Sequence, residues 1–343
     1  MKLLTYEKDG AQGVGAAISE GVINLTAALA ETHPGVNDAD SVLHIIQSGL
    51  DIDTVGEASI DQLRASGGLA KQLVAGYKLL PPVMRPPKIL ALALNFQEHI
   101  DETNLQFFDE PIVFAKYPSN MIADGDEIEL PPFEQKVDEE CELGVVMGAD
   151  ARNILASEAD AYIFGYTICN DVSARNRQRE RSKMGQPYAY AKNFATFCPV
   201  GPWVVTKKEV GDPANLKMAV RINGKTTREG NSGNMTFSTH EVVAYCSDYA
   251  GLEAGDIISL GTFAGEKQIY AGDEVELTIL RNRLWRAARV ILDVSLHTGR
   301  MSVGEAVDVL VDCVRFERNA AELSSARAST PRREWSAAEP SLP

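Results

Sequence analysis

The chain has 343 residues, 45% of them hydrophobic and 24% charged, which is typical of a globular protein with a sizeable core. Its formal net charge of −15 opposes binding to nucleic acid or to an anionic membrane, so neither is expected as a partner. No apolar run approaches the roughly 18 residues that cross a bilayer, and the first residues lack a signal peptide's apolar stretch. We therefore expect a cytoplasmic protein whose scattered cysteines are buried, reduced thiols rather than nucleophiles.

The first 80 residues are predicted to form a small α/β domain. Strands are expected at residues 3–6 and 13–18, and helices at residues 42–47 and 59–77. The proline-rich run over residues 80–88 fits neither a helix nor a central strand, so we expect a stiff linker there.

Residues 87–280 are predicted to form a mainly β catalytic domain. Short apolar runs alternate with Gly, Pro and Asp turns, which is the pattern of successive strands. The expected strands are residues 88–94, 111–115, 142–147, 202–206, 217–222, 255–261 and 272–278. Asn223 and Gly224 have the signature of a two-residue hairpin turn.

The end of the chain changes in character. Residues 284–296 have helical apolar spacing, and Ser302 with Glu305 forms a capping box, so residues 281–323 are predicted to be an atypical helical extension. Residues 324–343 are rich in Ala, Ser, Pro and Arg, and we expect them to be disordered.

Three acidic residues are the best indication of chemistry. Glu140 and Glu142 lie two apart in a strand-like run and would point to the same face, and Asp171 ends another apolar run. Carboxylates held this close repel one another and need a basic partner or a divalent cation. Mg²⁺ and Mn²⁺ prefer such oxygen ligands. A solvated acidic edge or a carboxylate–arginine network would explain the same spacing.

His99 and Glu102 lie three residues apart on a predicted helix. Glu102 can then accept a hydrogen bond from one ring nitrogen and leave the other to act as a base. The alternative is an exposed histidine with an incidental acidic neighbour.

A basic segment and a glycine-rich turn complete the candidates. Arg175 and Gln178 lie one helical turn apart after Asp171, and Lys192 stands among aromatic residues, where it could stabilise an enolate. Gly261 and Thr262 follow a strand and could bring backbone N–H groups and a hydroxyl to an anion, unless they form only a turn. Arg177, Arg179 and Arg181 are expected to be a solvated charge run.

Taken in this order, these motifs resemble the fumarylacetoacetate hydrolase family from about residue 87 to residue 276. The resemblance implies an α+β, mainly β fold: a mixed β-sandwich roll with a smaller N-terminal domain, usually a homodimer. It also implies Mg²⁺ or Mn²⁺ (Ca²⁺ is an alternative) at Glu140, Glu142 and Asp171. A His99–Glu102 dyad would lie on a lid over the substrate, and the residues matching substrate-binding positions are Arg175, Gln178, Lys192, Gly261 and Thr262.

The implied reaction is hydrolysis of a C–C bond in a 2-oxo acid of the acylpyruvate or fumarylpyruvate type, through a metal-bound enolate. The dyad would activate water, and Lys192 would stabilise the enolate. Decarboxylation, isomerisation and dehydration at the same site are alternatives, as is a non-catalytic protein that binds metal and oxo acid. Phe96, Ala195 and Phe263 depart from the family's usual Tyr, Asp and Pro, which bears on substrate identity.

Overall fold

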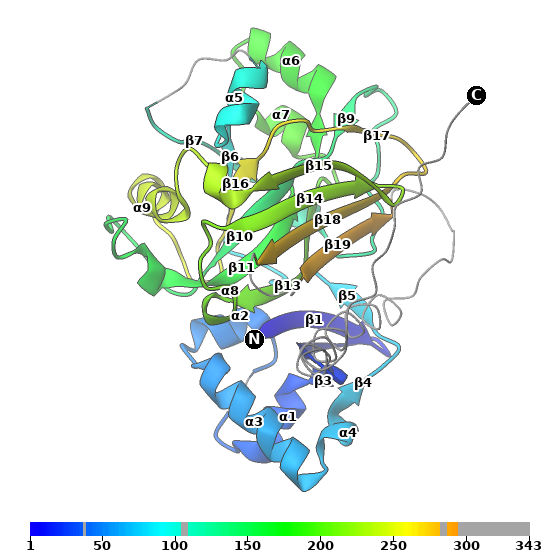
Figure 1. The fold of residues 1–343 in the computed structure, drawn as a ribbon, viewed down its shortest axis with the longest axis vertical. Coiled ribbons are helices and arrows are strands. Elements are labelled where there is room, and N and C mark those ends of the chain that lie inside the picture. Colours follow the sequence, from blue (N-terminus) through cyan, green and yellow to red (C-terminus); the bar gives the residue numbers. More distant parts are fainter. Residues whose placement is uncertain (37–38, 104–108, 282–286, 294–343) are drawn as a thin grey trace, which may run out of the picture.

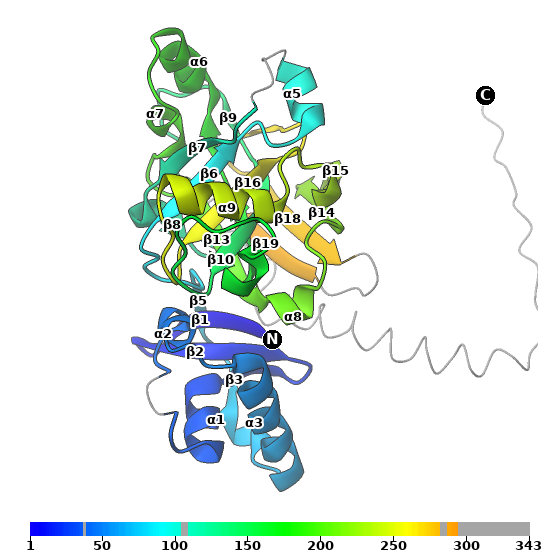
Figure 2. The same ribbon diagram turned by 90° about the vertical axis from the view of Figure 1, so that its left-hand side faces the viewer.

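The computed structural model describes residues 1–36, 39–103, 109–281 and 287–293. A small unit with strands and helices lies at one end of the molecule, and a larger body built on sheets lies above it (Figure 1). Helices α5, α6 and α7 cap the far end of the body (Figures 1 and 2). Among the described helices, none combines the length and the apolar character that spanning a bilayer requires.

One large mixed sheet runs through both parts of the molecule. It joins the N-terminal strands to the body because β1 pairs with β13. In spatial order its strands are β4 (Leu73–Val74), β3 (Gly21–Asn24), β2 (Ala11–Ile18), β1 (Lys2–Lys8), β13 (Cys198–Thr206), β11 (Ile163–Asn170), β10 (Cys141–Met147), β16 (Ile257–Thr262), β6 (Ile89–Ala93) and β7 (Ile112–Lys116). Off this path, β5 (Lys78–Leu80) pairs with β1, and β8 (Met121–Ile122) with β13.

Two smaller sheets complete the body. One consists of β15 (Lys225–Asn231), β14 (Leu216–Ile222), β18 (Glu274–Arg281) and β19 (Ala287–Asp293), and the other of β12 (Ser173–Ala174), β9 (Val137–Asp138) and β17 (Gln268–Ile269). Leu143 and Ile168 of the large sheet share one apolar core with Val220 and Leu277 of the four-stranded sheet. The two sheets therefore pack face to face as a sandwich.

A second apolar core lies on the other side of the large sheet. Leu3 and Ile23 of the N-terminal strands pack there with Leu29 and Leu63 of the helices. The helices are α1 (Leu25–Thr32), α2 (Val42–Gln47), α3 (Ile52–Ser66), α4 (Leu69–Gln72), α5 (Gln97–Thr103), α6 (Arg175–Lys183), α7 (Ala189–Lys192), α8 (Lys207–Val210) and α9 (Thr239–Tyr249), with 3₁₀ turns at η1 (Pro118–Asn120), η2 (Ala159–Tyr162) and η3 (Ser232–Asn234).

The structure confirms the α+β, mainly β class and each predicted strand of the body, within a few residues at the ends. It also confirms the hairpin turn, in which Asn223 and Gly224 have positive φ angles of 52° and 74°. The helix predicted over residues 59–77 is misplaced. It begins at Ile52, where the Asp51 side chain accepts from the backbone N–H of Thr54, and it ends at Ser66, because the left-handed conformation of Gly67 stops it.

The predicted helix over residues 284–296 is wrong for the part that the structure describes. Residues 287–293 form β19, which pairs antiparallel with β18 and extends the four-stranded sheet. An unpaired edge of β18 offers a row of backbone partners, and β-branched Val290 and Ile291 suit a strand, so pairing prevails over apolar spacing. The predictions for residues 294–323, including Ser302 and Glu305, and for residues 324–343 lie outside the described residues.

Close strand packing at Gly165 gives a stability prediction. A Cβ at this position on β11 would lie 2.2 Å from the carbonyl oxygen of Val205 on β13. Gly165→Ala should therefore lower the free energy of unfolding by about 1–3 kcal/mol, measured by urea denaturation. Gly35→Ala is the matched control, because nothing lies within 4 Å of its Cβ position. Equal stability of the two variants would contradict the prediction.

Candidate active site

The three predicted carboxylates converge where β10 and β11 meet. Cys141 on β10 pairs with Asn170 on β11, and the backbone N–H of Asp171 donates to the carbonyl of Glu140 at 3.0 Å. This register brings the end of one strand beside the start of the other. Glu140, Glu142 and Asp171 are all buried, and one carboxylate oxygen from each lies within 4.8 Å of the other two.

Basic side chains surround two of these carboxylates. The ammonium of Lys192 lies 2.5 Å from Glu140 and 2.5 Å from Asp171, and the ammonium of Lys116 lies 2.5 Å from Asp171. Arg175 donates to Glu140 at 2.5 Å. Burial alone would lower the pKa of Lys192, but Asp171 and Glu140 outweigh burial and raise it. Glu140 and Asp171 therefore have lysine and arginine side chains as close ion-pair partners.

Glu142 differs because its partners are neutral. Its Oε2 accepts from the Ser259 hydroxyl at 2.6 Å and from the backbone N–H of Gly261 at 2.9 Å. Burial, together with the charges of Asp171 and Glu140, raises the pKa of Glu142 to about 8. Within the described residues, no lysine or arginine forms an ion pair with it. Three carboxylate oxygens this close together, one of them without a basic ion-pair partner among the described residues, fit a divalent ion.

His99, on α5, lies against two carboxylates, one on the same helix and one on the loop after β16. Its Nδ1 is 3.4 Å from Glu266 and 4.0 Å from Glu102, the partner that the sequence suggested. The ring is buried, in contrast to the exposed-histidine alternative. Burial opposes ionisation of Glu266, but His99 and Arg175 outweigh it and hold the pKa of Glu266 below its usual value. Glu102 accepts from the backbone N–H of Gly265 at 3.0 Å and so ties α5 to the loop that carries Glu266.

Every nitrogen of the Arg175 guanidinium is used within the protein. It donates to Asp138 and Glu266 at 2.9 Å each and to Glu140 at 2.5 Å, and it donates to Gln178 at 2.9 Å. The sequence suggested that Arg175 and Gln178 bind substrate. The structure places both beside the cavity, but the arginine is committed to holding the carboxylates in position.

Gly261 and Thr262 also serve the protein framework. Gly261 has φ +89°, and an added Cβ would lie 3.0 Å from the Asn95 Cβ, so only glycine presents its N–H to Glu142 here without strain. The Thr262 hydroxyl donates to the carbonyl of Cys141 at 3.0 Å and accepts from Arg228 at 2.9 Å. Arg228 also forms a buried ion pair with Glu139, 2.7 Å apart.

Two of the unusual positions contact each other. Phe96 and Phe263 are fully buried, and their rings meet edge to face with centroids 6.3 Å apart. The Arg228 guanidinium covers the Phe263 ring at 4.1 Å. Phe263 thus contacts both the Phe96 ring and the guanidinium of the Arg228–Glu139 ion pair. Ala195, the third unusual position, is exposed in a turn.

A cavity of about 600 Å³ joins these groups. Its lining includes most of the predicted residues: His99, Glu102, Glu140, Glu142, Arg175, Gln178, Lys192 and Thr262. Asp171 and Gly261 lie directly behind the lining, through their contacts with Lys192 and Glu142.

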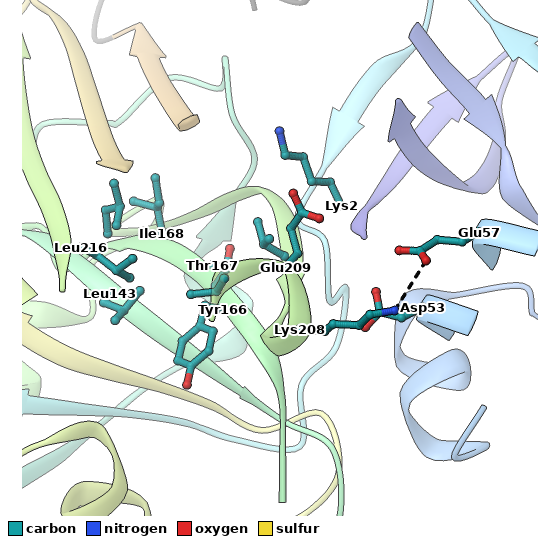
Figure 3. Close-up of a pocket in the computed structure, with 13 residues that line it drawn as sticks. Lys2, Asp53, Glu57, Leu143, Tyr166, Thr167, Ile168, Lys208, Glu209 and Leu216 are labelled. Atoms are coloured by element: carbon teal, nitrogen blue, oxygen red, sulfur yellow. Dashed lines mark ion pairs between the residues drawn. The ribbon is translucent and has the colours of Figure 1, made fainter. Parts of the chain in front are cut away.

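A second, smaller cavity of about 240 Å³ lies between the N-terminal unit and the sheets (Figure 3). Leu143, Ile168 and Leu216 line one side of it, and the paired Lys208 and Glu57 stand on the other. None of the predicted site residues lines it, so it is not the candidate active site.

Sequence reasoning missed three groups of the site. Lys116 follows an expected strand, Glu266 lies far from His99 in the chain, and Asp138 precedes the carboxylate pair. The sequence offered two local signals: a lysine directly after the apolar run at residues 112–115, and an acidic residue shortly after the Gly261 turn. Their partners lie 55, 167 and 37 residues away, which single-sequence spacing does not reveal.

The described cysteines do not contribute a nucleophile. Cys141, Cys169, Cys198 and Cys246 are buried and unpaired, as predicted. Burial raises the pKa of Cys198 to about 11 and that of Cys246 to about 12, so the thiolate is disfavoured. Cys313 lies outside the described residues.

Comparison with known proteins agrees with this geometry. The sequence model described as Fumarylacetoacetate (FAA) hydrolase C-terminal matches residues 88–292, more than half of the chain. The human mitochondrial oxaloacetate tautomerase FAHD2A is 40% identical over 214 residues, which cover 61% of this chain and 67% of that protein.

Solved structures show the same fold. The 5-carboxymethyl-2-hydroxymuconate delta-isomerase from Mycobacterium smegmatis is 29% identical with a TM-score of 0.57, covering 65% of this chain and 82% of that chain. The maleylpyruvate hydrolase from Sphingobium sp. SYK-6, in complex with manganese(II) and pyruvate, is 25% identical with a TM-score of 0.67, covering 87% and 100%.

A mainly β sandwich with buried, converging carboxylates under a helical cap defines the class of this protein. The chain belongs to the fumarylacetoacetate hydrolase family, as the sequence motifs predicted.

Proposed function

We propose that this protein is a divalent-metal-dependent enzyme that converts a small 2-oxo acid through its enolate. One observation carries the proposal. The carboxylates of Glu140, Glu142 and Asp171 lie together at the wall of a cavity, with a buried lysine beside them and a histidine–carboxylate pair on the lining. The site therefore contains positive charge that can stabilise a negative charge formed during the reaction, and a group that can transfer a proton.

The metal site is assigned to Glu140, Glu142 and Asp171. Mg²⁺ and Mn²⁺ both suit three carboxylate oxygens, and the Sphingobium relative was solved with manganese(II). A divalent ion here would polarise the carboxylate and keto oxygens of a bound 2-oxo acid. Lys192 forms ion pairs with two of these carboxylates, Glu140 and Asp171. Its ammonium and a divalent ion would therefore compensate the same negative charge.

Lys192 and His99 are assigned the chemical roles. Lys192 keeps its positive charge, because Asp171 and Glu140 raise its pKa, and it can therefore stabilise an oxyanion at C2 of the substrate. His99 is assigned the transfer of a proton at C3, with Glu266 orienting the ring through Nδ1. Arg175 holds Glu140, Glu266 and Asp138 in place and does not touch the reacting atoms.

Keto–enol tautomerisation is the reaction we favour. The enol loses the proton of its C2 hydroxyl, C3 gains one proton, and the composition of the acid is unchanged. This needs only the groups named above, and the human relative at 40% identity is an oxaloacetate tautomerase. Hydrolysis of a C–C bond, the reaction first suggested by the sequence, is the second candidate. It adds an attacking water, and the maleylpyruvate hydrolase with a similar fold favours it.

The metal assignment predicts a thermal shift. Mn²⁺ at about 100 times its dissociation constant should stabilise the protein by about 2.7 kcal/mol, and Glu142→Gln should remove this effect. Differential scanning fluorimetry with and without Mn²⁺ measures it. Glu229→Gln on the exposed face of β15 is the charge-matched control. An unchanged Mn²⁺ shift in Glu142→Gln would contradict the assignment.

The histidine assignment predicts a ranking of three variants. His99→Ala should lower kcat by about 10²- to 10⁴-fold, the usual contribution of a general base. Glu266→Gln should lower kcat more than Glu102→Gln, because Nδ1 is 3.4 Å from Glu266 and 4.0 Å from Glu102. All three should keep the Mn²⁺ shift. The reverse ranking would return the orienting role to Glu102.

Two assays separate the candidate reactions. With Mn²⁺ present, enolic oxaloacetate should lose its ultraviolet absorbance faster with the protein than with metal alone, without release of pyruvate. Release of pyruvate from an acylpyruvate would instead identify a C–C hydrolase. If the protein accelerates neither reaction nor decarboxylation beyond the metal blank, the enzymatic proposal fails. The homodimer and the cytoplasmic location stay predictions.

A further inference from the structure

Helix α6 presents one polar face to the cavity. Arg175, Gln178, Arg179, Ser182 and Lys183 all line it, at the spacing that places residues on one side of a helix. No apolar residue interrupts this face. Of the three basic residues on this face, only Arg175 takes part in the carboxylate contacts described above; Arg179 and Lys183 do not.

Burial changes along this face. Arg175 is buried at the floor beside Glu140, Gln178 is half-buried, and Arg179 and Lys183 are exposed at the mouth. At about 1.5 Å of rise per residue, Arg179 lies ~6 Å and Lys183 ~12 Å along the helix axis from Arg175. Arg179 therefore stands further from the carboxylates by about the length of a small diacid, and Lys183 stands further out along the same face.

The outer cations also differ in their partners. Among the described residues, neither Arg179 nor Lys183 forms a hydrogen bond or ion pair with an acidic side chain. Arg177 and Arg181, on the other side of α6, stack on Phe133 at 5.3 Å and on Tyr190 at 5.2 Å. The sequence suggested one solvated run of arginines. The structure separates the run: Arg177 and Arg181 pack on aromatic rings, and Arg179 lies at the cavity beside Lys183.

The formal charges that line the cavity balance when every carboxyl group is ionised. Five acidic and five basic side chains are found among the described lining residues, although the chain as a whole carries −15. The acidic ones are Glu102, Asp138, Glu140, Glu142 and Glu266, and the basic ones are Lys136, Arg175, Arg179, Lys183 and Lys192. With a divalent cation on the carboxylates, the cavity has two positive charges in excess, which matches a dianion.

We propose that Arg179 and Lys183 form a subsite for the second anionic group of the substrate, which makes the preferred substrate a 2-oxo diacid. This rests on the proposed function and names its substrate class. The 2-oxo carboxylate end lies at the floor beside Lys192 and the carboxylates. The distal carboxylate extends toward the mouth and accepts hydrogen bonds from the guanidinium of Arg179 and the ammonium of Lys183.

The experiment compares a diacid with its distal monoester. Oxaloacetate and its 4-methyl ester share the reacting centre and differ by one negative charge. Binding of each to the Mn²⁺-loaded protein is measured by titration calorimetry, and kcat/KM is measured beside it. The test variant is Arg179→Gln with Lys183→Gln. The charge-matched control is Arg177→Gln with Arg181→Gln, which removes the same two charges from the face of α6 that packs on aromatic rings.

The expected result is selective loss. An exposed ion pair contributes about two- to fivefold in affinity, so the test variant should bind the diacid about tenfold more weakly. The monoester should change by less than about twofold, and the control should resemble the wild type. Equal weakening of diacid and monoester, an equal effect of the control, or unchanged diacid binding would each overturn the subsite.

Calorimetry separates this proposal from the proposed function. Selective weakening of diacid binding without turnover by the wild type would sustain the subsite and refute the enzymatic proposal. Turnover of both compounds, with no selective effect of Arg179→Gln and Lys183→Gln, would support the enzymatic proposal and refute the subsite. If neither compound binds to the Mn²⁺-loaded wild type, both are refuted.

Discussion

Burial of three like charges at one point is the constraint on which this structure depends. Glu140, Glu142 and Asp171 are almost inaccessible to water, and ionised carboxylates in such a place repel one another unless cations or hydrogen-bond donors surround them. Lys116, Lys192 and Arg175 surround two of them. Glu142 receives only a hydroxyl and a backbone N–H, so the compensation is incomplete on that side.

A second layer of interactions fixes the loop that faces this cluster. Arg228 and Glu139 form a buried pair that also bonds to Thr262, Phe263 and Lys267. The same loop carries Glu266, which contacts His99 and Arg175. The position of the proposed proton-transfer group therefore follows from a buried ion pair at the base of the loop and from the Phe96–Phe263 contact, as much as from its own helix.

Helix α6 links the floor of the cavity to its mouth. Its first residue, Arg175, is committed to the carboxylate network, so charge for the far end of a substrate has to come from residues further along the helix. Two arginines on its other side pack on aromatic rings. Arg179 and Lys183, on the opposite side, line the cavity. One side of this helix thus packs against aromatic rings, and the other carries the proposed subsite for the substrate.

The sequence by itself determined what local chemistry dictates. The strands of the body and the Asn223–Gly224 hairpin turn follow from short-range periodicity and turn geometry, and the ordered motifs predicted the family. Only the tertiary structure decided the partners. Lys116 and Glu266 reach the site from distant parts of the chain, and residues 287–293 became a strand because β18 had an edge to pair. Such contacts depend on which strands and loops become neighbours, and spacing along one sequence does not contain that information.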